Sequence, residues 1–275
     1  MSFPMAKAAL IQLVSDASVV NNLNRVDYWL EKAKNQSVDL VLLPENVAFM
    51  GKHETDKLRV AEDFGVGQIQ ERLASLAKKH QLWLVAGTIP LKTPHARVRA
   101  ASLVFDFEGR CVARYYKIHL FDVRVSEEEA HQESATIEPG NEIVLVDTPV
   151  GRLGLSVCYD LRFPELYRRM ALQGAELFSI PSAFTRTTGL AHWEVLLRAR
   201  AIENLCYVLA PNQGGMHENG RQTHGHSLIV DPWGRILGQS QKGEALVIAD
   251  IDLGRLHELR KQFPCHDHHV LEESK

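Results

Sequence analysis

The chain has 275 residues, of which 45% are hydrophobic and 24% are charged, and its net charge at pH 7 is -3. This length suggests one or two globular domains, and the composition is ordinary for a protein that folds around a buried core. The balanced charge argues against nucleic acid or an anionic membrane surface as a partner, and no run of about 18 apolar residues could span a bilayer.

The first half of the chain alternates between expected strands and helices. Residues 6–14 form an apolar run without a cleavage site, which predicts a first strand and not a signal peptide. Apolar residues at helical spacing predict helices over 21–34 and 66–80. Short apolar runs and turn signals predict strands over 38–43 and 82–89 and a hairpin of 101–107 with 111–116. Polar loops are expected over 92–99 and 125–133.

The second half repeats this alternation. Strands are expected over 142–146, 152–157, 175–180, 206–211, 227–230, 235–239 and 245–251, and helices from 164, over 192–204 and over 253–263. Loops are expected over 181–190 and 214–223. No linker divides the chain, so we expect a single domain over 1–275, with a core of about 5–263 and a polar tail over 264–275. The pattern indicates an α/β class with two mixed sheets and outer helices, but does not itself show that the sheets form a sandwich.

The stretch 154–167, GLSVCYDLRFPELY, contains a cysteine in a distinctive setting. It begins as an apolar run, reaches Cys158 and then becomes polar, before Pro164 and Glu165 open a helical pattern. A cysteine on a sharp turn between a buried strand and a helix has the geometry of a nucleophile elbow, with sulfur in place of hydroxyl. The alternative is an unreactive buried side chain, which free cysteine often is.

Glu45, Lys117 and Cys158 each follow an expected strand. Sites in α/β proteins gather outside the carboxyl ends of strands, so these side chains are expected to converge. A closed apolar pocket would raise the pKa of Glu45 and make it a base for the thiol. Lys117 would lower the thiol pKa and, with the backbone N–H of Tyr159, stabilise an oxyanion. Taken singly, Glu45 is also compatible with a surface carboxylate and Lys117 with a solvated cation.

Three motifs carry a family resemblance: LPEN around Glu45, YKIHLFD around Lys117 and CYDLRFPE from Cys158. Together, and in this order, they resemble the Glu-Lys-Cys signature of the nitrilase (carbon–nitrogen hydrolase) superfamily. The segments 192–203 and 225–234 extend the resemblance, which covers the chain to about 263. It implies a four-layer α-β-β-α sandwich, no metal or organic cofactor, and a homodimer or higher homo-oligomer that stacks helices across its interface.

The same resemblance implies a role for each matching residue. Glu45 corresponds to the general base, Lys117 to the lysine that stabilises the oxyanion, and Cys158 to the nucleophile that forms a thioester as ammonia leaves. Glu133 corresponds to a supporting glutamate. The neighbouring acidic run 127–129 is interpreted as a solvated charged surface.

Within the superfamily, the segments 181–189 and 192–203 are most similar to the deaminated-glutathione amidase branch, with omega-amidases as near relatives. This implies a small amide that bears a carboxylate, which Arg162 or Arg186 could bind. A structural role for Arg162 and a solvated loop position for Arg186 remain equally compatible with the sequence. The alternatives are an omega-amidase acting on alpha-ketoglutaramate, a nitrilase, or a non-catalytic interaction protein that retains the fold. A papain-like hydrolase is disfavoured, because no histidine shows the expected local signature.

The spacing of the cysteines and of the C-terminal histidines indicates neither a metal site nor a redox site. The cysteines are widely spaced and contain no CxxC pair: Cys111, Cys158, Cys206 and Cys265. In a long chain without a secretion signal, this predicts reduced thiols and a cytoplasmic location. No metal site is expected from the tail histidines, which lack a helix or strand to hold them: His266, His268 and His269.

Overall fold

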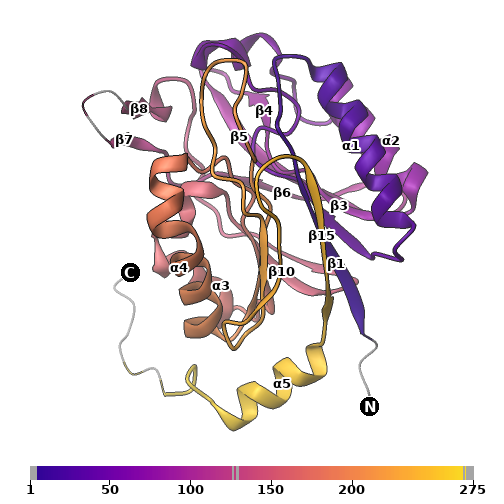
Figure 1. The fold of residues 1–275 in the computed structure, drawn as a ribbon, viewed down its shortest axis with the longest axis vertical. Helices are drawn as coiled ribbons and strands as arrows, with labels where there is room; N and C mark the ends of the chain where they lie inside the picture. Colours follow the sequence, from indigo (N-terminus) through magenta and orange to yellow (C-terminus); the bar gives the residue numbers. More distant parts are fainter. Residues whose placement is uncertain (1–4, 126, 128–129, 269, 271–275) are drawn as a thin grey trace.

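The computed structural model describes residues 5–125, 127, 130–268 and 270. Glu128 and Glu129 of the acidic run, and His269 of the tail, lie outside the described residues. Two large sheets face each other and helices cover their outer faces, so the chain forms an α-β-β-α sandwich (Figure 1). The α/β class indicated by the pattern, and the sandwich implied by the resemblance, are confirmed.

The first sheet has seven strands in the order β15-β1-β2-β3-β5-β4, with β6 paired to β5. Its β1–β2 and β2–β3 pairs are parallel and its other pairs are antiparallel. The strands are β1 (Ala6–Gln12), β2 (Leu40–Leu42), β3 (Trp83–Val85), β4 (Ile89–Lys92), β5 (Val98–Phe105), β6 (Cys111–Tyr116) and β15 (Ala245–Ile251).

The second sheet has six strands in the order β14-β13-β12-β11-β10-β9, in which β10, β11 and β12 run parallel. A separate hairpin of β7 and β8 projects from the sandwich beside α4 (Figure 1). The strands are β7 (Asp122–Arg124), β8 (Ala130–Gln132), β9 (Leu145–Thr148), β10 (Gly151–Leu155), β11 (Leu177–Ser179), β12 (Tyr207–Ala210), β13 (Leu228–Val230) and β14 (Ile236–Gln239).

Helices α1 and α2 lie together on one outer face, and α3 and α4 lie on the opposite face (Figure 1). The α-helices are α1 (Val19–Lys34), α2 (Gln68–His80), α3 (Pro164–Leu172), α4 (Arg186–Asn204) and α5 (Leu253–Gln262), and the 3-10 helices are η1 (Glu54–Arg59), η2 (Glu133–Ala135) and η3 (Cys158–Arg162). Among the helices of the described chain, none combines the length and hydrophobicity that a bilayer span requires.

Successive residues of the parallel strands are buried in different layers. In β2, Leu40 and Leu42 pack in the cluster between the sheets, whereas Val41 packs in the cluster beneath α1 and α2. Side chains alternate between the two faces of a strand, so a strand covered on both faces must be apolar throughout. This burial explains why 40–43 is a continuous apolar run.

One difference from the expected elements places a functional residue. The expected strand 82–89 is broken into β3 and β4 at residues 86–88. Gly87 has φ +56°, and a Cβ there would lie 1.9 Å from the carbonyl oxygen of Pro44. Thr88 then accepts a hydrogen bond of 2.9 Å from the backbone N–H of Asn46. The break therefore brings this segment against the turn that carries Glu45.

Three further elements differ from the expectations. Helix α4 begins at Arg186 and not at 192, because the Thr185 hydroxyl caps it by accepting from the N–H of Thr188. The loop expected over 125–133 is shortened by the β7–β8 hairpin, and the loop expected over 92–99 is shortened because β4 and β5 extend into it. Strand pairing decides the boundaries of these two loops, whereas the Thr185 cap decides where α4 begins.

Candidate active site

Cys158 lies on the turn between β10 and α3, at the start of η3. Its φ of +48° is in the left-handed region, which few residues other than glycine adopt. The conformation is held because the N–H of Cys158 donates a hydrogen bond of 2.9 Å to the carbonyl of Pro181. Such a strained turn is the geometry expected for a nucleophile elbow.

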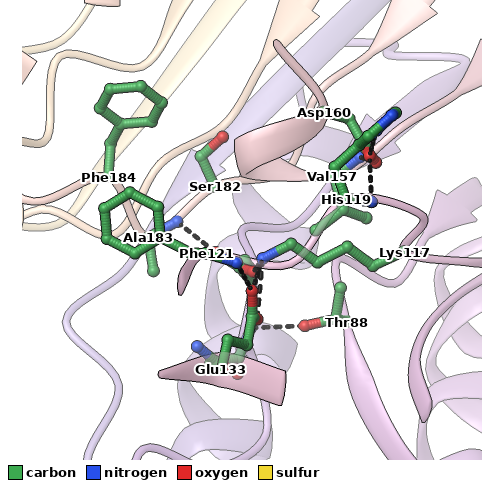
Figure 2. Close-up of polar contacts among 12 residues, drawn as sticks. Thr88, Lys117, His119, Phe121, Glu133, Val157, Asp160, Ser182, Ala183 and Phe184 are labelled. Carbon is green, nitrogen blue, oxygen red and sulfur yellow. Dashed lines mark hydrogen bonds and ion pairs between the residues drawn. The ribbon is translucent and has the colours of Figure 1, made fainter. Parts of the chain in front are cut away.

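Asp160 anchors this turn from inside the protein. Its fully buried carboxylate accepts hydrogen bonds from the N–H of Val157 at 2.8 Å and from the Tyr115 hydroxyl at 2.7 Å. It also accepts from the backbone N–H of His119 at 2.9 Å, and Nδ1 of that histidine lies 2.7 Å away (Figure 2). The elbow is thereby tied to the segment that follows Lys117.

The Glu45 carboxylate is 4% exposed and contacts groups from three other segments. Oε1 accepts a hydrogen bond of 2.9 Å from Nζ of Lys117, and Oε2 accepts one of 2.8 Å from the backbone N–H of Ala183. The thiol of Cys158 is close enough to lower the pKa of this carboxylate. Glu45 is therefore placed to take the thiol proton.

Lys117 is buried between two carboxylates. Its Nζ lies 2.9 Å from Glu45 and 2.8 Å from Glu133, toward which it points in Figure 2. Glu133, at the start of η2, also accepts a hydrogen bond of 2.7 Å from the N–H of Phe121. Two carboxylates around one ammonium hold the ammonium in a single position.

The pKa values of the three central groups follow from burial and from this pairing. Burial alone would raise the pKa of Glu45, but Lys117, the hydrogen bond from the thiol and the charge of Arg221 together bring it below its ordinary value. Burial would lower the pKa of Lys117, but Glu133 and Glu45 raise it well above its usual range. The resting site therefore holds an ionised glutamate and a charged lysine.

The Cys158 thiol has a raised pKa, first because it is buried and second because Glu45 is negatively charged, and Lys117 only partly opposes these effects. Two expectations from the sequence are therefore corrected: the pKa of Glu45 is not raised, and the pKa of the thiol is not lowered overall. The reason is that Lys117, at 2.9 Å, helps to outweigh the burial of Glu45, whereas at the sulfur burial and the charge of Glu45 outweigh the lysine. Thiol deprotonation must then accompany attack on the substrate.

These groups open onto a cavity of about 110 Å³. Its wall comes from the segments around β8 and η2, the elbow, the start of α4 and the loop before β13. Its charged lining residues are Glu45, Glu54, Lys57, Lys117, Glu133 and Arg221. Residues from the segments 125–133, 185–190 and 214–223 all contribute to this wall.

The structure brings together four of the residues singled out from the sequence, Glu45, Lys117, Glu133 and Cys158. The backbone N–H of Tyr159 has no hydrogen-bond acceptor among the described residues, which leaves it available beside the thiol. These placements match the geometry that the sequence predicts, and the catalytic roles stay predictions.

Neither arginine proposed to bind a substrate carboxylate lines the cavity. Arg162 lies 3.2 Å from Nδ1 of His192, with its guanidinium 5.6 Å from the ring centre of Phe184. Arg186 donates to the side-chain oxygen of Gln222 at 3.2 Å. In this conformation both are occupied by protein contacts, and their role in binding stays a prediction.

Sequence reasoning missed three contributors to the site: the N–H of Ala183, the Asp160 carboxylate and the side chain of Arg221. Asp160 was visible as a charged residue two positions after the cysteine. Ala183 acts through its backbone, which leaves no signal in the sequence. Arg221 lies in a loop of glycine and polar residues without periodicity, so its direction could not be predicted.

A thiol, a carboxylate and an ammonium that converge on one cavity define a cysteine-dependent hydrolase, whose chemistry passes through an acyl-enzyme. The chain belongs to the carbon–nitrogen hydrolase family, whose family model matches residues 7–261. It is 42% identical to the deaminated glutathione amidase of Synechocystis over 268 residues, which cover 96% of this chain and 97% of the relative.

Solved structures agree with this assignment. The structure of the NitFhit protein of C. elegans superposes with a TM-score of 0.90 at 39% identity, covering all of this chain and 69% of that one. An amidase from Nesterenkonia, as a mutant with acrylamide added at its active site cysteine, superposes with a TM-score of 0.79 at 26% identity, covering 94% of this chain and 98% of that one. The chain is an amidase of the carbon–nitrogen hydrolase family, and these relatives do not favour a nitrilase or a non-catalytic protein.

Proposed function

We propose that this chain hydrolyses deaminated glutathione, or a closely related small amide that bears a carboxylate, through a thioester on Cys158. The observation that carries the proposal is the convergence of Cys158, Glu45 and Lys117 on one cavity. The identity to deaminated glutathione amidases over nearly the whole chain supports the substrate.

In the acylation step, Cys158 Sγ attacks the amide carbon while its proton passes to the Glu45 carboxylate. The carbonyl oxygen becomes an oxyanion, which the Lys117 ammonium and the free N–H of Tyr159 stabilise. Removing one oxyanion donor typically lowers a rate by about 10²–10³. Because the pKa of Lys117 lies well above its usual range, this lysine acts by its charge and not by transferring a proton.

The tetrahedral intermediate then collapses and the carbon–nitrogen bond breaks. The protonated Glu45 gives its proton to the departing nitrogen, leaving a thioester on Cys158. Glu45 next takes a proton from water as that water attacks the thioester. The carbon–sulfur bond then breaks, the acid is released, and Glu45 gives its proton to the departing sulfur, which restores the thiol. Glu133 supports both steps because it fixes the ammonium of Lys117 between the two carboxylates.

The identity of the leaving group depends on the amide. A primary amide releases ammonia, as expected from the sequence. Deaminated glutathione has lost its free amino group, and the amides that remain in it are both substituted. Its hydrolysis therefore releases an amine, so an assay for ammonia alone would not detect it.

We also propose that the chain is one domain, with a core of about 5–263, and that it works without a cofactor as a homodimer or higher homo-oligomer in the cytoplasm. Apolar side chains exposed on α4 support a helix-stacking interface: Leu190, Val195 and Ile202 are 70%, 68% and 48% exposed. Four free cysteines support a reducing compartment.

The test compares the wild type with Cys158→Ala on deaminated glutathione, alpha-ketoglutaramate, simple amides and a nitrile. Mass spectrometry of the products identifies the bond that breaks. We expect the wild type to hydrolyse deaminated glutathione fastest and Cys158→Ala to hydrolyse none, with unchanged circular dichroism. Turnover by the variant, or a wild type inactive on every amide, would contradict the proposal.

A further inference from the structure

The charged residues that line the cavity are paired, with one exception. Lys117 lies between Glu45 and Glu133, and Lys57 lies 2.7 Å from Glu54. Arg221 lines the same cavity and has no carboxylate within ion-pair distance among the described residues. A cation without a counter-ion beside a cavity is available for an anionic group of the substrate.

A single residue, Ala183, connects Arg221 to the general base. Nη2 of Arg221 donates a hydrogen bond of 2.8 Å to the carbonyl of Ala183. The N–H of the same residue donates at 2.8 Å to Oε2 of Glu45, and it is close enough to the sulfur to lower the pKa of the Cys158 thiol. Standard backbone dimensions therefore place the guanidinium within about 10 Å of the sulfur.

The loop that carries Arg221 is held in place by its own hydrogen bonds. The N–H of Arg221 donates to the side-chain oxygen of Asn219 at 2.9 Å, and the carbonyl of Arg221 accepts from the N–H of His217 at 3.0 Å. The His217 ring is itself buried, with Nδ1 2.9 Å from the carbonyl oxygen of Ser15. The guanidinium is therefore presented from a fixed position.

The position of Arg221 relative to Glu45 indicates which part of a substrate it contacts. In the proposed mechanism, Glu45 gives its proton to the departing nitrogen, so the leaving group lies on the Glu45 side of the sulfur. Arg221 is connected to that carboxylate through Ala183 and lines the same cavity. A leaving group that extends from the nitrogen past Glu45 meets the guanidinium.

We propose that Arg221 binds the carboxylate of the departing amine, so that the enzyme selects substituted amides with an acidic leaving group over primary amides. This inference rests on the proposed function and deepens it. The dipeptide amine of deaminated glutathione ends in a carboxylate and spans at most about 7 Å when extended, which suits this separation. Arginine is suited to the role because its planar fork can make two parallel hydrogen bonds to a carboxylate.

The test uses two substrates with the same acyl group: deaminated glutathione, which releases an amine with a carboxylate, and alpha-ketoglutaramate, which releases ammonia. For Arg221→Gln we expect kcat/KM on deaminated glutathione to fall about 10- to 100-fold, mainly through KM, as for a lost charged hydrogen bond. Activity on alpha-ketoglutaramate should fall much less than activity on deaminated glutathione, because ammonia offers no carboxylate for Arg221 to bind. Arg221→Lys should retain part of the selectivity.

Arg59→Gln is the matched control, because Arg59 is on η1, close to Lys57, and its side chain is 85% exposed. It should change neither rate. If Arg221→Gln lowers kcat/KM equally for both substrates, the role of this arginine is structural and the inference is wrong. The inference is also wrong if the variant and the wild type have equal kcat/KM values on each substrate.

A second substrate pair separates this inference from the proposed function. N-succinylglycine and succinamate share an acyl group, and their leaving groups are glycine and ammonia. If the wild type does not hydrolyse deaminated glutathione, the proposed substrate is wrong, but Arg221→Gln should still lower the preference for N-succinylglycine over succinamate. An unchanged preference would refute the role of Arg221 whatever the natural substrate is.

Discussion

Replacing Glu45 with glutamine should separate the two effects that this carboxylate has on Cys158. Glu45 takes the thiol proton during attack, but its negative charge also raises the thiol pKa in the resting site. Glu45→Gln removes both effects and leaves Lys117 as the nearest charge. We therefore expect a slower enzyme with a more acidic thiol.

General electrostatics and general acid–base catalysis set the size of both changes. Two unit charges about 4 Å apart interact by about 4 kcal/mol at an effective dielectric constant of about 20, which corresponds to about three pKa units. Loss of the charge should thus lower the thiol pKa by at least about one unit after relaxation of the site. Loss of a general acid–base group should lower kcat by about 10³ or more, because Glu45 serves both acylation and deacylation.

The glutamine should also destabilise the fold slightly. Glu45 accepts at one oxygen from Lys117 and at the other from the N–H of Ala183, whereas a glutamine amide has one acceptor oxygen. One donor therefore loses its acceptor, at a cost of about 1–3 kcal/mol. Urea unfolding of both proteins measures this difference.

The assay is the rate of iodoacetamide alkylation of Cys158 against pH, with the site of modification identified by mass spectrometry. The alkylation midpoint should move to lower pH in Glu45→Gln while amide hydrolysis is lost. Glu71→Gln, an exposed position on α2, is the matched control and should leave both curves unchanged. A midpoint that stays constant or rises would refute the electrostatic reasoning, and retained hydrolysis would refute the role of Glu45 as base.

Three further predictions follow from the same contacts. The kcat/KM of the wild type should stay level from about pH 5 to about pH 9, because Glu45 ionises below its ordinary pKa and the thiol pKa is raised; an acid limb centred near pH 7 in the pH–rate profile would contradict this. Lys117→Met should abolish activity and lower the free energy of unfolding by about 3–5 kcal/mol, since two buried carboxylates lose their cation. A urea midpoint equal to that of the wild type would show that the ion pairs are not stabilising. Asp160→Asn should destabilise the fold by about 1–3 kcal/mol and lower kcat, because the buried carboxylate accepts from several donors and the amide has fewer acceptor sites. Thermal unfolding and steady-state rates measure these two effects, and a variant with normal stability and a normal rate would show that the elbow does not need Asp160.

The sequence predicted the position of the nucleophile well, because the signal for an elbow is local. A buried strand must be apolar, a turn is polar and a helix shows its own spacing, so the change of pattern around Cys158 is visible within a few residues. Glu45 was recognisable for the same reason, as a charged residue directly after an apolar run.

The contacts that position these groups could not be predicted in this way. Arg221 donates a hydrogen bond to the carbonyl of Ala183, 38 residues away in the chain, and Lys117 pairs with Glu45, 72 residues away. A local sequence pattern does not predict which backbone groups of the two sheets will form hydrogen bonds with each other. The break of the strand at Gly87 was missed because it depends on the approach of Pro44 from a neighbouring strand.

By itself, the sequence determined the class of fold, the order of most strands and helices, and the residue types needed for acyl transfer. Only the tertiary structure decided their electrostatics. Burial alone predicts a raised pKa for Glu45, but the adjacent ammonium of Lys117 reverses the sign, because Coulomb interactions at hydrogen-bond distance outweigh desolvation here. The tertiary structure also decided which cation faces the cavity without a partner, since a side chain acquires its charged neighbours only when distant segments pack together.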